Sequence, residues 1–158
     1  MKNSEIAGVF QDIASLLEAK GENQFKVRAY RRVSRSIERL PVELEQLVNE
    51  DRLKEVPGVG DAIADKITEM IITGRLGYYE RLKAEFPEAM TALLDVPGIG
   101  PKTAMRILRE LDIKYIDELE LAVAEGRLAS LSRIGDRTVE NINRHLKEFK
   151  RKGRCISG

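Results

Sequence analysis

The sequence predicts an all-α protein made of two small helical units. Apolar residues recur at helical spacing along nearly the whole chain, and no segment alternates convincingly between apolar and polar residues as a strand would. A glycine-containing motif that opens a helical segment also occurs twice, at well separated places in the chain. A chain of 158 residues is long enough for two small domains, and we place them at residues 1–81 and 82–158.

The predicted helices follow one another with short connections. A first apolar stripe, from Ile6 to Leu17, predicts an amphipathic helix near the N-terminus. A second stripe begins at Phe25 and stops at Pro41, because proline cannot continue a helix interior. Further helices are expected at residues 44–48, 61–73, 76–86, 88–94, 101–111, 117–125 and 136–150. The last five residues, RCISG, are expected to be irregular.

Composition bounds the class of protein. The chain is 42% hydrophobic and 34% charged, which is typical of a globular protein. Aromatic residues make up only 5%, which argues against a surface built to stack on bases. No apolar run approaches the ~20 residues of a membrane span, no signal peptide is recognisable, and the single Cys155 excludes an internal disulfide. We therefore expect a cytoplasmic monomer without membrane contact.

The segment VPGVGDAIADKI, residues 56–67, looks at first like a nucleotide-binding glycine loop. A P-loop needs Lys and then Ser or Thr after its second glycine, but Asp61 and Ala62 follow Gly60. A dinucleotide-binding loop needs a preceding strand and a third small residue, where this chain has Ile63. Neither nucleotide-binding reading is favoured.

The segment VPGIGPKTAMRI, residues 96–107, repeats the motif in unbroken register. A degenerate third copy, LSRIGDRTV at residues 131–139, has Arg133 where the other two have their first glycine. The first glycine of each copy permits a positive φ, and the second lets a ligand approach the backbone closely. The following residue begins a helix, for which Pro101 and the acidic Asp61 are both suited.

This pattern is that of a helix-hairpin-helix motif, which offers free amides at a helix N-terminus to a DNA phosphate and reads no base. The residues expected to contact DNA in the two clear copies are Gly58, Gly60, Gly98, Gly100, Lys102 and Arg106. The alternative is a glycine turn between helices that serves packing alone.

Charge is unevenly distributed although the net charge is only +1. Residues 20–39 and 144–154 are strongly basic, whereas acidic residues collect elsewhere. The two basic segments are consistent with phosphate contacts, or else with ordinary solvated helix faces.

The order of these segments resembles the N-terminal part of the X-family DNA polymerases, the DNA polymerase beta type. The segments that carry the resemblance are FKVRAYRRVSRSI, VPGVGDAIADKI, ITGRLGYYERL and VPGIGPKTAMRIL. It extends from about Asn3 to Lys152 and implies binding to gapped or nicked DNA with a 5′-phosphate, in DNA repair. In many members the first unit is also a lyase that removes a 5′-deoxyribose phosphate. The family's palm domain has no counterpart in these residues, so Mg²⁺ is expected only in such a palm.

The resemblance also implies roles for individual residues. The lyase nucleophile falls on Lys66, the phosphate pocket on Lys26 and Tyr30, and the base-stacking aromatic on Phe25. A second phosphate-binding lysine of the family falls on Ala62, and Arg28 or Arg31 is a candidate to replace it. A K⁺ or Na⁺ ion is expected at hairpin backbone carbonyls, those of Lys54, Val56 and Val59 and those of Leu94, Val96 and Ile99.

Three functions remain open at this point. The chain is the DNA-binding part of a repair polymerase with lyase activity, a DNA-binding module without chemistry, or a helical protein-interaction module.

Overall fold

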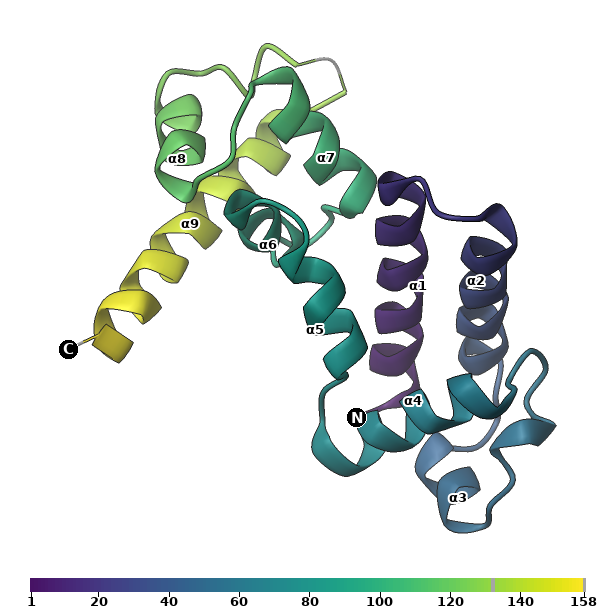
Figure 1. The fold of residues 1–158 in the computed structure, drawn as a ribbon. Coiled ribbons are helices and arrows are strands. Elements are labelled where there is room, and N and C mark those ends of the chain that lie inside the picture. The colour runs from purple at the N-terminus through teal and green to yellow at the C-terminus, as the bar shows by residue number, and fades with distance from the viewer. Residues whose placement is uncertain (132, 158) are drawn as a thin grey trace. The chain divides into compact units, whose positions relative to one another are not determined.

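The computed structural model describes residues 1–131 and 133–157, with side chains through residue 148. All regular structure in these residues is helical, as predicted (Figure 1). The chain divides into two compact units, Met1–Leu82 and Lys83–Gly158.

Unit 1 is built on two long helices that lie side by side, followed by shorter ones (Figure 1). Its elements are α1 (Asn3–Lys20), α2 (Gln24–Glu38), α3 (Leu44–Asn49), the 3-10 turn η1 (Leu53–Glu55), α4 (Asp61–Thr73) and most of α5 (Gly77–Ala84). The short turn η1 is not among the predicted helices.

The turn between α1 and α2 follows from local chemistry. Gly21 ends α1 with φ +85°, which glycine adopts without strain. Asn23 then caps α2, where its side chain accepts a hydrogen bond from the backbone N–H of Phe25 at 2.7 Å. The buried Ser34 hydroxyl donates to the Ala7 carbonyl at 2.7 Å, which joins the two helices inside the core.

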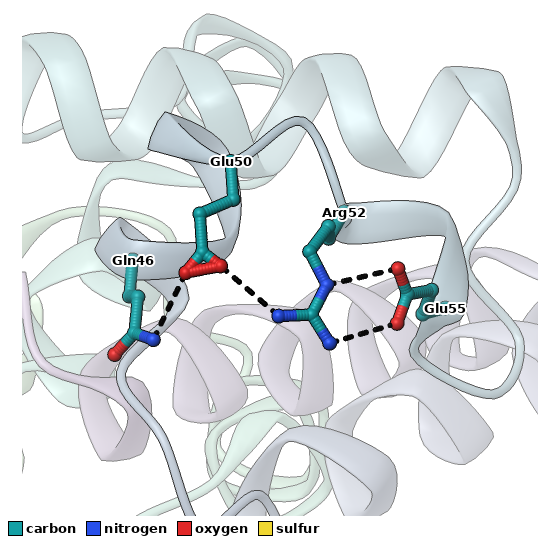
Figure 2. Close-up of polar contacts among 4 residues, drawn as sticks. All are labelled: Gln46, Glu50, Arg52 and Glu55. Carbon is teal, nitrogen blue, oxygen red and sulfur yellow. Dashed lines mark hydrogen bonds and ion pairs between the residues drawn. The ribbon is translucent and has the colours of Figure 1, made fainter.

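Polar contacts fix the segment that leads into the first hairpin. Figure 2 shows Arg52 between two carboxylates, with Nε and Nη2 donating to Glu55 at 3.0 and 3.1 Å and Nη1 donating to Glu50 at 3.0 Å. Gln46 donates to the same Glu50 carboxylate at 3.0 Å. These hydrogen bonds hold the pKa of Glu50 and Glu55 below the usual range. Arg52 is thus engaged within unit 1 rather than available to a phosphate.

Unit 2 contains α6 (Glu88–Leu94), α7 (Pro101–Glu110), α8 (Ile116–Ala124) and α9 (Asp136–Ser157). Helix α6 contacts each of the other three, and its Met90 and Leu93 are fully buried. Because α9 runs to Ser157, the expectation of an irregular C-terminal end is wrong for residues 154–157. The preceding polar residues, mostly Lys, Arg and Glu, are good helix formers, and no proline interrupts them.

Candidate nucleic-acid interface

All three motif copies fold as hairpins with the same turn. The first glycine has φ +90° at Gly58 and φ +86° at Gly98, and Arg133 takes φ +68° at the equivalent place. Arginine reaches this left-handed region at a cost that glycine does not incur. The degenerate copy therefore keeps the turn although it has lost the residue that suits it.

Hydrogen bonds repeat in the same way. The backbone N–H of the residue after the first glycine position donates to the carbonyl three residues earlier, at 3.0 Å for Val59 to Val56, 3.1 Å for Ile99 to Val96 and 3.4 Å for Ile134 to Leu131. The first bond of each following helix reaches the second glycine, at 2.9 Å for Ala64 to Gly60, 3.0 Å for Ala104 to Gly100 and 3.2 Å for Val139 to Gly135. Each hairpin thus presents its second glycine where the next helix begins.

Neither the backbone conformation nor the surrounding packing requires glycine at the second glycine position of each hairpin. Gly60 has φ −100° and Gly100 φ −96°, values that any residue adopts. A Cβ added at Gly60, Gly100 or Gly135 would meet no atom within 4 Å. Neither backbone strain nor packing within the protein explains these glycines. The missing side chain instead leaves space for a ligand to approach the backbone.

The first hairpin is packed onto α2. A Cβ at Gly58 would lie 3.3 Å from Val33 Cγ2 and 3.6 Å from Arg32 Cδ. Val33 is fully buried, whereas Arg32 is exposed, so the arginine lays its aliphatic stem on the hairpin and keeps its head in solvent.

The helix starts after the two glycine hairpins carry different charges. In the first, Asp61 opens α4 and forms an exposed ion pair with Lys54. A hydrogen bond from Lys54 and its charge hold the pKa of Asp61 below the usual range, and the same bond and charge raise the pKa of Lys54. In the second, the buried Pro101 opens α7 and an exposed Lys102 follows. Arg106, one turn later, pairs with Glu110 at 3.3 Å.

Lys66 lies at the end of a row of aromatic rings in unit 1. Its Nζ is 4.8 Å from the centroid of the Tyr78 ring, a cation–π contact. Tyr78 stacks on Tyr30 at 6.3 Å, and Tyr30 stacks on Phe10 at 5.9 Å. In the described part of the chain, Lys66 forms no ion pair with a carboxylate. Its amine therefore rests on an aromatic face rather than on an acid.

Tyr30 is a core residue, only 5% exposed. Burial, followed by the charge of and hydrogen bond to Tyr78, raises the pKa of the Tyr30 phenol above its ordinary value. Three neighbours in the first turns of α2 are exposed by contrast: Phe25, at 79%, with Lys26 and Arg28. The structure thus presents part of the predicted pocket at the surface and the tyrosine in the interior.

Two other predictions concern the hairpin carbonyls and the basic C-terminal segment. The carbonyls of Val56 and Val96, two of those expected to hold a cation, each accept a hydrogen bond within their hairpin. Of the basic segment 144–154, Arg144 and Lys147 are exposed, and the side chains beyond residue 148 lie outside the described residues.

A pocket of about 430 Å³ lies beside the first hairpin. Its lining is mainly acidic and polar: Val48, Asp51, Leu53, Lys54, Asp61, Ala64, Asp65 and Thr68. This composition does not suit an anionic ligand such as DNA.

Sequence reasoning missed two contacts, those of Tyr78 with Lys66 and of Arg32 with Gly58. Each joins residues from two different segments of the chain, and no motif spacing marks them. Tyr79 also anchors α5, where its hydroxyl and the Asp12 carboxylate lie 3.0 Å apart.

Comparison with known proteins identifies the same motifs. Residues 1–76 match the model of a helix-hairpin-helix domain, and residues 90–148 match that of a SAM-like helix-hairpin-helix tandem. No helix in the described part of the chain is both long and apolar enough to cross a bilayer.

Relatives of known name include two polymerases. The chain is 29% identical over 148 residues to DNA polymerase/3′-5′ exonuclease PolX of Bacillus subtilis, covering 94% of this chain and 25% of that protein. It is 24% identical over 180 residues to DNA polymerase lambda of Arabidopsis thaliana, covering 99% and 33%. Holliday junction branch migration complex subunit RuvA of Prosthecochloris aestuarii is 24% identical over 102 residues, covering 65% and 51%.

This chain thus spans a quarter to a third of the length of its two polymerase relatives. It carries helix-hairpin-helix domains in both units, and along its whole length it is homologous to the N-terminal part of the X-family DNA polymerases.

Proposed function

We propose that this chain binds DNA through the phosphate backbone at gaps or nicks, without reading base sequence, as the N-terminal part of a repair polymerase. The observation that carries the proposal is the second glycine of each hairpin. Gly60 and Gly100 leave open space at a helix start, where backbone amides point outward and attract an anion. A DNA phosphate is the anion that a helix-hairpin-helix motif suits.

The exposed cations support the same proposal. Lys102 lies two residues after Gly100 in the first turn of α7, and Lys26 and Arg28 are exposed near the start of α2. Phosphate contacts of this kind give an affinity that falls steeply with salt and ignores sequence. Arg52 is the opposite case, because its guanidinium is held by Glu50 and Glu55, and we exclude it from the interface.

Binding to a duplex with a one-nucleotide gap tests this function. The chain is titrated with the gapped duplex, with and without a 5′-phosphate, at two salt concentrations and in two unrelated sequences. We expect a preference for the phosphorylated gap, affinity that falls with salt, and no dependence on sequence. Binding that is absent, or insensitive to salt, would leave only the protein-interaction module.

A lyase at Lys66 is a second proposal, and it is supported by the lack of an acidic partner for Lys66 among the described residues. The amine of Lys66 would attack the C1′ aldehyde of a ring-opened 5′-deoxyribose phosphate, lose water to form an imine, and allow β-elimination of the 3′-phosphate. Attack requires a neutral amine, and no carboxylate in the described residues pairs with Lys66 to hold its proton. The cation–π contact with Tyr78 positions the side chain and is lost on deprotonation.

Borohydride trapping on an incised abasic site tests the lyase separately from binding. We expect a covalent adduct with the wild-type chain and none with Lys66→Ala. Lys66→Arg is the matched control, because arginine keeps the positive charge for binding and does not form the imine. An adduct that survives Lys66→Ala would rule out this nucleophile while leaving the DNA-binding function intact.

We further propose a K⁺ or Na⁺ ion at each hairpin, held by the carbonyls of Lys54, Val56 and Val59 and of Leu94, Val96 and Ile99. Carbonyl oxygens are hard ligands suited to such ions. Replacement of K⁺ by a bulky organic cation at constant ionic strength should then weaken DNA binding.

A further inference from the structure

Exposed arginines form a line along one side of α2. We call these four residues the α2 arginine stripe: Arg28, Arg32, Arg35 and Arg39. Their successive spacings of four, three and four residues put the three arginines within α2 on one helix face, and Arg39 follows at the helix C-cap. The opposite face carries Val27, Val33 and Ile37, which are fully buried in unit 1.

The arginines of the stripe are not paired with acidic residues in the described part of the chain. None of its members forms an ion pair with a described carboxylate. Arg31 of the same helix differs, because it lies off the stripe and pairs with Glu18 of α1. Like charges three and four residues apart repel one another and destabilise a helix. The arrangement therefore costs a little stability, and a bound anion would relieve it.

The stripe is also continuous with the first hairpin. The Arg32 stem lies over Gly58, two residues before Gly60. From Arg28 to Arg39 the stripe rises about 16 Å, at ~1.5 Å per residue. Phosphates of one strand rise ~3.4 Å each along the axis of a DNA duplex, so this length corresponds to about five of them measured along that axis.

We propose that the α2 arginine stripe is a phosphate track for one strand of duplex DNA next to the first hairpin. This inference rests on the proposed DNA-binding function and extends it, because the hairpins alone hold isolated phosphates. Guanidinium groups suit the track, since each stays charged and donates to two phosphate oxygens at once.

A pair of charge-matched variants tests the track. The first changes Arg28, Arg35 and Arg39 to glutamine and keeps Arg32, whose stem packs on the hairpin. The control changes Lys20, Arg52 and Arg75 to glutamine, three cations of unit 1 that already form ion pairs. Lys20 pairs with Glu22, Arg52 with Glu50 and Glu55, and Arg75 with Glu80. Both variants lose the same charge. Each is titrated with a blunt duplex of about 20 base pairs at several salt concentrations.

We expect the stripe variant to bind more weakly and to lower the slope of log affinity against log salt by about two to three, since each phosphate contributes ~0.9. Its melting temperature should equal or exceed that of wild type, because the repulsion is relieved. The control variant should change the slope by less than one. Equal slopes and affinities for the two variants would overturn the phosphate track.

A third variant separates this failure from failure of the proposed function. If Gly60→Ala with Gly100→Ala weakens DNA binding while the stripe variant does not, the hairpins bind DNA and the stripe alone is refuted. If the wild-type chain itself shows no salt-dependent binding, the DNA-binding function fails and the stripe fails with it.

Discussion

Two glycines of the first hairpin, Gly58 and Gly60, should respond to the same substitution in opposite ways. Gly58 has φ +90°, and a Cβ there would lie 3.3 Å from Val33 Cγ2. Gly60 has φ −100° and open space around the position of a Cβ. Alanine at Gly58 should therefore affect folding, and alanine at Gly60 should affect ligand binding.

The loss of folding stability expected for Gly58→Ala follows from the backbone conformation of this residue. The left-handed region costs a non-glycine residue about 1–2 kcal/mol, and the crowded Val33 contact adds to this. Alanine also reduces the conformational freedom of the unfolded chain, which stabilises the folded state by about 0.4–1 kcal/mol. We expect a net loss of roughly 1–2 kcal/mol, which lowers the melting temperature of a unit this size by about 5–15 °C.

For Gly60→Ala the same accounting gives almost no change in stability. Alanine is a poorer helix N-cap than glycine, and this offsets the gain from the unfolded chain, so we expect less than about 0.5 kcal/mol. A methyl group at the approach path of a phosphate should weaken at least one charge-assisted hydrogen bond. Such bonds contribute about 1.5–3 kcal/mol, so the Kd for gapped DNA should rise roughly 10- to 100-fold.

Hydrogen exchange resolved by segment provides the stability assay, because it reports α1 and α2 separately from unit 2. The Kd is measured by titration of gapped duplex at fixed salt. Gly8→Ala is the control, since a Cβ at Gly8 also meets no atom within 4 Å but lies inside α1, outside the three motif copies. The reasoning is refuted if Gly60→Ala destabilises unit 1 as much as Gly58→Ala, or if it binds DNA as tightly as the control.

Other predictions concern the third hairpin, the aromatic row and the first helix start. Arg133→Gly should stabilise unit 2 by about 0.5–1 kcal/mol in thermal unfolding, because glycine removes the cost of φ +68°, and an unchanged or lower melting temperature would count against it. Burial raises the pKa of Tyr30, so its contribution to stability is present below pH ~10 and is lost as pH rises further. Tyr30→Phe should remove this loss of stability at alkaline pH, and the exposed control Tyr115→Phe should not. Unfolding followed from pH 8 to 12 provides the measurement. Asp61→Asn should tighten DNA binding about 2- to 5-fold at low salt, because it removes a negative charge from the helix start and releases Lys54, and weaker binding would contradict this.

The sequence predicted what depends on local chemistry. The glycine motif predicted both clear hairpins, since positive φ at Gly58 and Gly98 is a property of a few consecutive residues. Helical periodicity and prolines predicted most helix positions, and the homology of the whole chain to X-family polymerases confirms the resemblance. The C-terminal helix was underestimated because residues 154–157 have little apolar pattern of their own.

Contacts between distant segments could not be predicted in the same way. Tyr78 reaches Lys66 only because α5 returns to the α1 and α2 core, where Tyr79 meets Asp12. Tyr30 was assigned to a phosphate pocket by resemblance, and its burial between Phe10 and Tyr78 depends on that same packing. The roles of Lys66, Lys26 and Phe25 stay predictions until trapping and binding are measured.

The equivalent backbones of the hairpins make their charge differences informative. The first and second hairpins share turn angles and hydrogen bonds, so geometry alone gives them equal capacity to hold a phosphate. The first, however, places the Asp61 carboxylate at the helix start and engages Lys54 with it, whereas the second places Lys102 there. A phosphate should therefore bind more strongly at the second hairpin than at the first. The first hairpin then needs cations from elsewhere, and the exposed arginines of α2, one of which covers Gly58, are the described residues in position to supply them.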